Sequence, residues 1–314
     1  MNLLTKIPLL KQSKNQIDHN SNLLLLGSCF TNNIGKKLDY FKFQNTQNPF
    51  GILFHPKAIE TLIENSVNKK EYTDNDIFFA NEQWHCFDAH SKLSNTSKDS
   101  LIKILNKQIA STNKLIQEST HIIITIGTAW VYRFIESDKI VANCHKVPQK
   151  QFDKKLLSVD EIVNSLKNIL NLILGLNNKA SVIFTVSPIR HIKDGFIENT
   201  QSKANILAAI HQVIKSQTYY FPSYEIMMDE LRDYRFYTED MIHPNETAIN
   251  YIWEKFQQVW ISDTSLVTME EIDGIQKGFL HKPFNPNSSK HKKFLQKLEV
   301  KKAKLQSQFP NILF

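Results

Sequence analysis

The chain has few cysteines, no long apolar run and no Cys-x-x-Cys pair. Its three cysteines, Cys29, Cys86 and Cys144, cannot all pair with one another, so neither a disulfide framework nor a zinc site is expected. No apolar stretch approaches the about 18 residues that a membrane helix needs, and the N-terminus lacks the apolar segment of a signal peptide. We therefore expect a cytoplasmic protein with reduced thiols and no membrane span.

Histidine motifs for metal binding are also missing. Eleven histidines are present, but none forms a His-x-x-x-His or His-Glu-x-x-His pattern, so we expect no metal and no other cofactor. Hydrophobic residues make up 41% of the 314 residues and charged residues 22%. This composition predicts a folded core large enough for one doubly wound domain and excludes a disordered chain.

Positive charge is concentrated near the C-terminus. The formal net charge is +7, and residues 277–304 hold many lysines against one acid, Glu299. The lysines that follow the core are Lys282, Lys290, Lys292, Lys293, Lys297, Lys301 and Lys302. Because no basic residues are interleaved with aromatic ones and no nucleic-acid module is recognisable, the pattern favours a solvated basic helix over nucleic-acid binding.

Short apolar runs alternate with helical patterns along the chain, without an internal repeat. The expected strands are 23–26, 41–43, 122–126, 182–186 and 224–228, and the expected helices are 34–41, 56–65, 97–118, 159–174, 202–216 and 246–259. Runs of this length that are apolar on both faces are typical of parallel strands covered by helices. The sequence therefore predicts a three-layer α/β/α fold with a five-stranded parallel sheet.

Two stretches interrupt this alternation, and a linker ends it. Residues 76–87 and 130–142 each place apolar residues on both sides of a turn, as β-hairpins do, and we expect them to be inserted near the carboxyl ends of the strands. The segment 282–289 is rich in Pro, Asn and Ser and leads to the lysine-rich terminal helix. We therefore expect a domain over residues 1–281 and a linker with a basic helical tail over 282–314.

A serine and a histidine stand where serine hydrolases need them. Ser28 follows the apolar run 23–26 and Gly27, so its hydroxyl is expected at the carboxyl edge of the sheet, which suits a nucleophile. Much later, Asp240 precedes His243 by three residues. An acid this close to a histidine fixes the imidazole tautomer and leaves the other ring nitrogen free to accept a proton from a serine. We predict Ser28 as nucleophile, His243 as general base and acid, and Asp240 as its orienting carboxylate.

Several short motifs resemble one known family. In chain order they read Gly27-Ser28-Cys29-Phe30, Asn48-Pro49-Phe50-Gly51, Gly127-Thr128-Ala129-Trp130, Asn143-Cys144-His145-Lys146-Val147-Pro148 and Ser187-Pro188-Ile189-Arg190-His191. Together they resemble the bacterial GSCFA-domain family, within the SGNH (GDSL-type) hydrolase superfamily. The resemblance implies a flavodoxin-like SGNH fold and a metal-independent serine esterase. Its substrate would be a small ester, such as an O-acetyl group on a carbohydrate-like alcohol.

One SGNH feature is missing from the sequence. Many members have a Gly-x-Asn-Asp block after the third strand, whose asparagine helps to bind the oxyanion, whereas this chain has Gly127-Thr128-Ala129-Trp130 there. Losing one oxyanion donor lowers the rate by about a hundred- to a thousandfold. The expected substitutes are the Cys29 amide at a helix start and, by resemblance, the Gly51 amide, with the side chains of Asn48 and Thr128 as further candidates. The Asn143 side chain could substitute as well.

Other polar residues are candidates for substrate binding, and each has a structural alternative. Asn143, His145, Arg190 and His191 follow strands and are expected to line the cleft, with packing as the alternative. Ser28 could be only a helix N-cap. Two other functions therefore stay open. One is O-acyl transfer on the same scaffold, and the other is a non-catalytic glycan- or ligand-binding module without oxyanion stabilisation.

Overall fold

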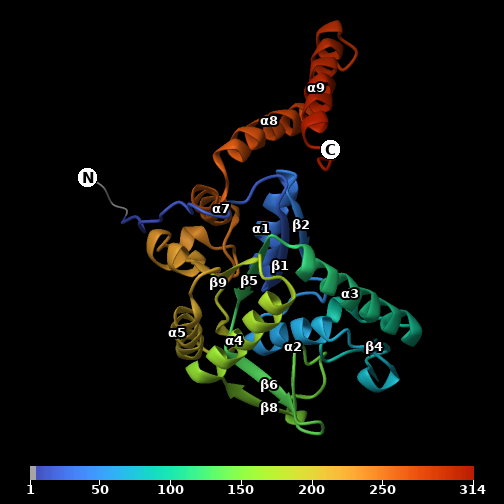
Figure 1. The fold of residues 1–314 in the computed structure, drawn as a ribbon, viewed down its shortest axis with the longest axis vertical. Helices are drawn as coiled ribbons and strands as arrows, with labels where there is room; N and C mark the ends of the chain where they lie inside the picture. Colours follow the sequence, from blue (N-terminus) through green and yellow to red (C-terminus); the bar gives the residue numbers. More distant parts are fainter. Residues whose placement is uncertain (1–4) are drawn as a thin grey trace.

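A five-stranded parallel sheet forms the centre of the protein (Figure 1), in a computed structural model that describes residues 5–314. Its strands are β1 (Asn22–Gly27), β2 (Gln44–Gln47), β5 (His121–Ile126), β9 (Ser181–Val186) and β10 (Thr218–Phe221). Their spatial order is β10-β9-β5-β1-β2, with every neighbouring pair parallel. This is the flavodoxin-like 2-1-3-4-5 order. The predicted α/β/α class and five-stranded parallel sheet are confirmed.

Helices cover both faces of this sheet. They are α1 (Cys29–Tyr40), α2 (Pro56–Val67), α3 (Lys98–Glu118), α4 (Val159–Leu176), α5 (Phe196–Val213) and α7 (Glu246–Trp260), and two further helices, α8 (Asp263–Leu280) and α9 (Ser289–Gln308), follow them. Along β1, Leu24 and Leu26 belong to one apolar cluster with α2 to α5, whereas Leu23 and Leu25 belong to another with α1 and α7. Successive side chains of a strand point to opposite faces, which explains why the strands read as continuous apolar runs.

Two of the predicted strands are wrong. Residues 41–43 follow the end of α1, and the strand is the neighbouring polar segment β2, which pairs only with β1 at the sheet edge. Residues 224–228 lie in a short helical segment that follows β10, where Ile226 and Met227 are buried by helical turns. Short apolar runs do not distinguish a buried strand from other buried segments, so the hydrophobic pattern assigned both segments wrongly. The helix α8 was not predicted at all.

Both predicted hairpins are present as inserted antiparallel sheets. The first pairs β3 (Phe78–Ala80) with β4 (Gln83–His85). The second, β6 (Trp130–Phe134) with β7 (Lys139–Val141), also pairs with β8 (Phe152–Leu156), a strand that the sequence reading missed. Because β6 begins four residues after β5 ends, this small sheet lies beside the carboxyl edge of the central one.

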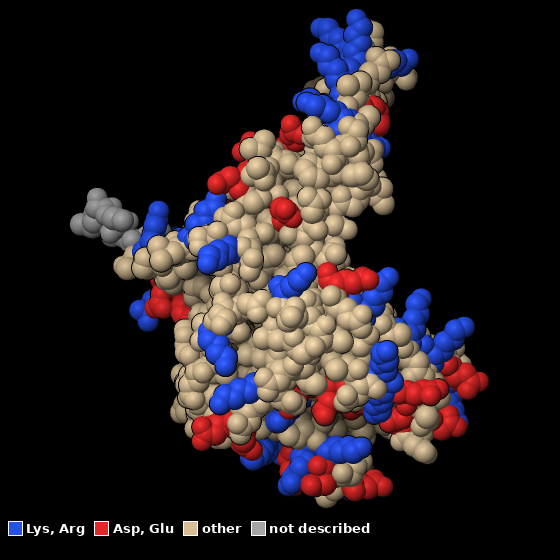
Figure 2. All heavy atoms as spheres, in the orientation of Figure 1, with Lys and Arg blue, Asp and Glu red and all other residues tan. Residues whose placement is uncertain are grey.

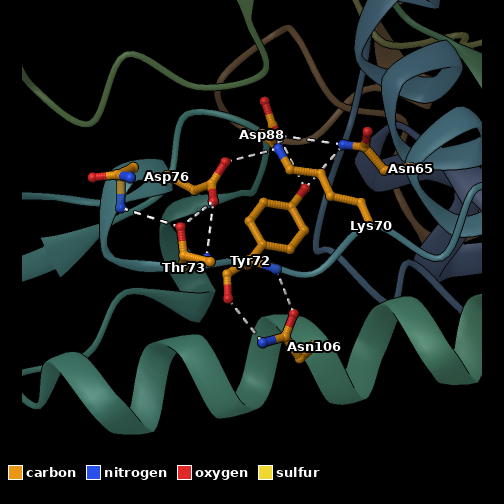
Figure 3. A network of polar contacts seen from close by, with 8 residues as sticks. Asn65, Lys70, Tyr72, Thr73, Asp76, Asp88 and Asn106 are labelled. Carbon is orange, nitrogen blue, oxygen red and sulfur yellow. Dashed lines mark hydrogen bonds and ion pairs between the residues drawn. The ribbon is translucent and has the colours of Figure 1, made fainter.

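A polar network fastens the segment between α2 and β3 to the core (Figure 3). The buried Tyr72 donates its hydroxyl to Asp88 at 2.9 Å, and its backbone exchanges two hydrogen bonds with the Asn106 side chain of α3. Lys70 pairs with Asp76 at 2.9 Å and with Asp88 at 3.4 Å. These groups satisfy one another, so the network is a structural anchor for the first insertion.

The C-terminal helices project from the body as an arm (Figure 1). Lys and Arg side chains gather over the distal part of this arm (Figure 2), and the exposed lysines of α9 are Lys290, Lys292, Lys293, Lys297, Lys301 and Lys304. The predicted basic helical tail is therefore present. Among residues 5–314, no helix combines the length and apolar character needed to cross a bilayer.

Candidate active site

Ser28 lies in a tight turn between β1 and α1. The preceding Gly27 has φ of +132°, and a Cβ atom there would be 2.1 Å from the Thr125 carbonyl oxygen of β5, so only glycine fits. Ser28 donates its N–H to the same carbonyl at 3.1 Å. Its Oγ caps α1 by accepting the Phe30 N–H at 3.3 Å. The turn places the hydroxyl at the carboxyl edge of the sheet, as predicted, but Ser28 is 0% exposed.

Asp240 and His243 form a close pair in the loop before α7. The His243 Nδ1 is 2.6 Å from Asp240 Oδ2, while Asp240 Oδ1 accepts hydrogen bonds from the Thr238 hydroxyl and the backbone amides of Ile242 and His243. The Thr238 hydroxyl, followed by the His243 amide and ring, holds the pKa of Asp240 well below its usual range. An ionised Asp240 accepts a hydrogen bond from the N–H at Nδ1. The other ring nitrogen, Nε2, is then unprotonated and can accept a proton.

Arg190 holds this loop against the end of β9. Its backbone N–H donates to the Ile242 carbonyl at 3.2 Å, and its guanidinium donates to the Met241 carbonyl at 3.0 Å. Met241 has φ of +58°, which marks a tight turn between the acid and the histidine. Arg190, expected in the cleft for substrate binding, thus orients the backbone that carries His243.

No hydrogen bond joins Ser28 to His243 among the described residues. The His243 side chain is 47% exposed, whereas Ser28 is buried. Both residues lie beyond the carboxyl ends of the parallel strands, since Ser28 follows β1 and the His243 loop is bonded to Arg190, which follows β9. Burial, the largest cause, and the charges of Lys203 and His243 lower the pKa of His191 to about 3.

The candidate oxyanion donors differ in whether their polar groups already make hydrogen bonds within the protein. The Cys29 N–H lies in the first turn of α1, where backbone amides have no intrahelical partner. Gly51 N–H donates to the Asn48 carbonyl at 2.8 Å within a turn. The Asn48 side chain accepts the Gly27 N–H at 2.8 Å and donates to Asn32 at 2.9 Å. Cys29 is accordingly the candidate least committed to other contacts.

Thr128, the remaining oxyanion candidate, is tied into the core. Its hydroxyl lies 3.1 Å from the Ser202 hydroxyl and accepts the Trp130 N–H at 3.1 Å. Its N–H donates to the Phe54 carbonyl at 3.0 Å. At 4% exposure, Thr128 supports the turn after β5, and both its hydroxyl and its N–H have partners within the protein.

Asn143 and His145 lie against the inserted hairpins. Asn143 Oδ1 accepts the His145 N–H at 2.8 Å, and the buried His145 ring contacts the Cys86 carbonyl at 2.8 Å and stacks near His85, with ring centroids 4.7 Å apart. Burial is the main cause that lowers the pKa of His145 to about 4. These contacts place both residues with β3 and β4, whereas Arg190 and His191 lie with the catalytic candidates.

Arg190 also lines an open pocket of about 460 Å³. Phe196, Tyr234 and Tyr237 line it, and the Arg190 guanidinium carbon is 5.1, 5.6 and 5.6 Å from their ring centroids, respectively. Phe196 and Tyr234 remain more than half exposed. Exposed aromatic faces beside a cation can stack on a sugar ring or another flat polar group.

Two residues of this region were missed from the sequence. Thr238 donates to Asp240, and Lys203 lies buried below His191 with its ammonium bonded to two backbone carbonyls. Thr238 stands only two residues before Asp240, so its short spacing was a usable signal. Lys203 carried no signal, because lysines are almost always exposed and only the tertiary fold buries this one.

Comparison with known proteins identifies the family. A sequence model of the GSCFA family matches residues 22–256, which is most of the chain. The chain belongs to the GSCFA family. A second model, described as the C-terminal domain of GSCFA domain proteins, matches residues 272–314 of this GSCFA protein, over α8 and α9. The resemblance inferred from the short motifs is confirmed.

Outside the family, the similarity to known proteins is weak. No curated protein sequence matches this GSCFA protein. One similar solved structure is a carbohydrate esterase family 3 protein from Talaromyces cellulolyticus, with 9% sequence identity, a TM-score of 0.36, and coverage of 81% of this chain and 99% of that one. A likeness at this level carries no argument about the activity of the GSCFA protein.

Proposed function

We propose that this protein is a metal-independent serine esterase of the SGNH type, which removes a small acyl group from an alcohol. The observation that carries the proposal is the Asp240–His243 pair, with 2.6 Å between Nδ1 and Oδ2 and an acid held ionised. A purely structural role would not require the Asp240 carboxylate to accept four hydrogen bonds, one of them from the exposed His243 ring. Ser28, on the same sheet edge, is the nucleophile that this pair would serve.

The reaction proceeds through an acyl-enzyme. Ser28 Oγ attacks the acyl carbon while His243 Nε2 takes its proton, and the carbonyl electron pair moves onto oxygen, near the Cys29 N–H. When the carbonyl re-forms, the alcohol leaves with the proton from His243. Water then repeats the sequence, and the acid and Ser28 are released. An acceptor alcohol in place of water would make the same protein an O-acyltransferase.

The aromatic pocket beside Arg190 suits the alcohol side of the substrate. Its exposed rings, Phe196 and Tyr234, adjoin the loop that carries His243. A carbohydrate-like alcohol could stack there with its ester directed to the sheet edge. An O-acetyl sugar is therefore the proposed substrate class.

A binding module without catalysis is the second candidate. It is favoured by the buried Ser28 hydroxyl, which caps α1 and makes no hydrogen bond with His243 among the described residues. In this case the pocket at Arg190 would bind a ligand that is not turned over. Ser28→Ala would then affect only the stability of α1.

Release of nitrophenol from p-nitrophenyl acetate separates the two functions. We expect a burst in the wild type, and we expect Ser28→Ala and His243→Ala to lose about a thousandfold or more in kcat. Ser97→Ala is the matched control, since Ser97 caps α3 with the same 3.3 Å bond and lies outside the site. Equal rates in the wild type and in both site variants would contradict the esterase. Faster product formation with an added sugar acceptor would indicate transfer.

A further inference from the structure

Lys203 of α5 is buried without a carboxylate partner. It is 1% exposed, and none of the ion pairs among the described residues includes it. Its Nζ donates to the carbonyls of Gly127 and Ser187, at 2.7 Å each. Removing an ammonium from water without a nearby counter-charge is strongly unfavourable. A merely structural position would favour an apolar side chain here.

The two acceptor carbonyls show where this charge lies. Gly127 follows the end of β5, and Ser187 follows the end of β9. Ser187 N–H also donates to the Ile126 carbonyl at 2.8 Å, so the two strand ends are joined twice. Strand β5 is the direct neighbour of β1, which ends at Gly27, immediately before Ser28. The ammonium therefore lies at the same sheet edge as the nucleophile.

Titratable side chains of the proposed site lie close to this ammonium. Burial raises the pKa of the Cys29 thiol next to the nucleophile, and Lys203 is among the groups that lower it. Burial and then Lys203 lower the pKa of His191, on which the charge of His243 acts as well. The centroid of the Tyr224 ring is 5.5 Å from Nζ.

We propose that Lys203 is a charged positioning residue of the Ser28 site, which joins the ends of β5 and β9 and supplies positive charge where the oxyanion forms. The inference rests on the proposed esterase function and gives a reason why the chain lacks the usual SGNH asparagine. Lys203 transfers no proton. Its charge favours the electron pair that moves onto the carbonyl oxygen while the Cys29 N–H binds that oxygen.

The protonation state of Lys203 gives the inference a specific signature. Burial lowers the pKa of Lys203 to about 7, while Cys29 acts in the opposite direction. The ammonium is present below that pH and is lost above it. The kcat/KM of the wild type is therefore expected to fall as the pH rises through about 7.

The first experiment measures kcat/KM for p-nitrophenyl acetate between pH 5 and 10. Lys203→Met should lower kcat/KM by about 10- to 100-fold at pH 6, with little change in KM. This loss is smaller than the loss of about 10²–10³-fold in kcat that follows removal of a direct oxyanion donor. The pH profile of Lys203→Met should also lack the fall near pH 7. Lys203→Arg should keep its charge over the whole range, so kcat/KM should no longer fall near pH 7. Unchanged activity and pH profile in Lys203→Met would overturn the inference, while Ser28→Ala reports separately on the function.

Lys255→Met is the matched control for loss of a buried lysine. Lys255 is 9% exposed but is paired with Glu230, on the other face of the sheet. We expect this variant to unfold at lower urea and to retain the wild-type kcat/KM and pH profile while folded. If it reproduces the Lys203→Met profile, a general stability effect explains both and the inference fails.

A second measurement needs no turnover. Iodoacetamide alkylation of Cys29, followed by peptide mass spectrometry from pH 6 to 10, reads the charge next to the nucleophile. Because wild-type Lys203 loses its charge near pH 7 while the pKa of Cys29 is raised, the wild type and Lys203→Met should alkylate alike above that pH. Lys203→Arg, which stays charged, should move half-maximal alkylation to lower pH than in the wild type. If Lys203→Met does not fold, the wild type and Lys203→Arg still provide the comparison. Superimposable profiles of the wild type and Lys203→Arg would overturn the inference even if the protein hydrolyses no ester.

Discussion

Gly27 is the residue that fixes the position of Ser28. Substitution by alanine would place Cβ 2.1 Å from the Thr125 carbonyl oxygen, in a backbone conformation with φ of +132°. Strain of this kind destabilises by about 1–3 kcal/mol, and the contact adds to it. We predict that Gly27→Ala lowers the urea midpoint of unfolding, measured by circular dichroism, and abolishes labelling of Ser28 by a fluorophosphonate.

Gly175→Ala is the control for this prediction. Gly175 lies in α4, where a Cβ atom would meet nothing within 4 Å. Alanine there should stabilise the protein by about 0.5–1 kcal/mol through helix propensity. If Gly27→Ala and Gly175→Ala shift the urea midpoint equally, the close approach of β1 to β5 does not restrict position 27 to glycine.

The Asp240 carboxylate is predicted to act through the tautomer of His243. In Asp240→Asn the side chain is isosteric but no longer attracts the proton on Nδ1, so we expect a loss of about 10³–10⁴ in kcat with little change in stability. Asp138→Asn, which alters an exposed acid paired with Arg133 outside the pocket, should keep the wild-type rate. Nitrophenol release at pH 7.5 measures both variants, and an active Asp240→Asn would exclude the orienting role.

Residue-scale prediction from the sequence succeeded only where the information is local. Asp240 and His243 are three positions apart, so their pairing follows from the chain itself, and the structure shows it at 2.6 Å. The partners of Arg190 and Lys203 are carbonyls that the fold brings together over distances of 51 and 76 residues. No composition or spacing rule reports such partners, because backbone carbonyls are present at every position.

At the scale of elements, a buried ion pair ties the first described segment to α7. Glu230 accepts the Ile7 N–H at 2.6 Å and the Tyr251 hydroxyl, and it pairs with Lys255 at 3.2 Å. Burial alone would raise the pKa of Glu230, but the bonds from Tyr251, Ile7 and Lys255 together hold it below its ordinary value of 4.5. The carboxylate therefore stabilises the fold above pH 4.5, and this stabilisation is lost as the pH falls through the lowered pKa.

Glu230→Gln should reveal this dependence. At pH 7 we expect a loss of about 3–5 kcal/mol in the free energy of unfolding, because Lys255 is left buried without a partner. Below the folded pKa the wild-type carboxyl is protonated as well, so the difference from the variant should shrink there. Urea unfolding at a series of pH values from 7 downward tests this, with the exposed Glu136→Gln as control. A difference independent of pH would contradict the ionised role.

Element types were predictable where a segment is apolar throughout. Strands β1, β5 and β9 are central, so both of their faces need apolar residues, and the pattern identified them. The edge strand β2 reads Gln-Asn-Thr-Gln, is half-buried and pairs with a single neighbour. Its pairing is decided by the register with β1 rather than by its own composition, so no local pattern could have predicted it.

Across the whole molecule, α8 connects two apolar clusters. Its Met269 packs in the cluster below α1 and α7, whereas Ile272 and Ile275 pack with Leu305 and Ile312 from the C-terminal segment. The chain end also returns to the body, where Asn311 donates to the His19 carbonyl at 2.8 Å. The domain boundary proposed at residue 282 therefore falls between two helices that share one apolar cluster.

Truncation after residue 281 tests how far the arm is independent. The shortened chain would expose Ile272 and Ile275 of α8, which are 0% and 1% exposed in the full chain. Exposed apolar surface of this kind promotes self-association, so we expect stronger binding of the dye ANS and a larger species in size-exclusion chromatography. Replacing Lys293, Lys297, Lys301 and Lys304 by glutamine should leave both readouts unchanged. A monodisperse chain of residues 1–281 without dye binding would show that α9 is a separate appendage.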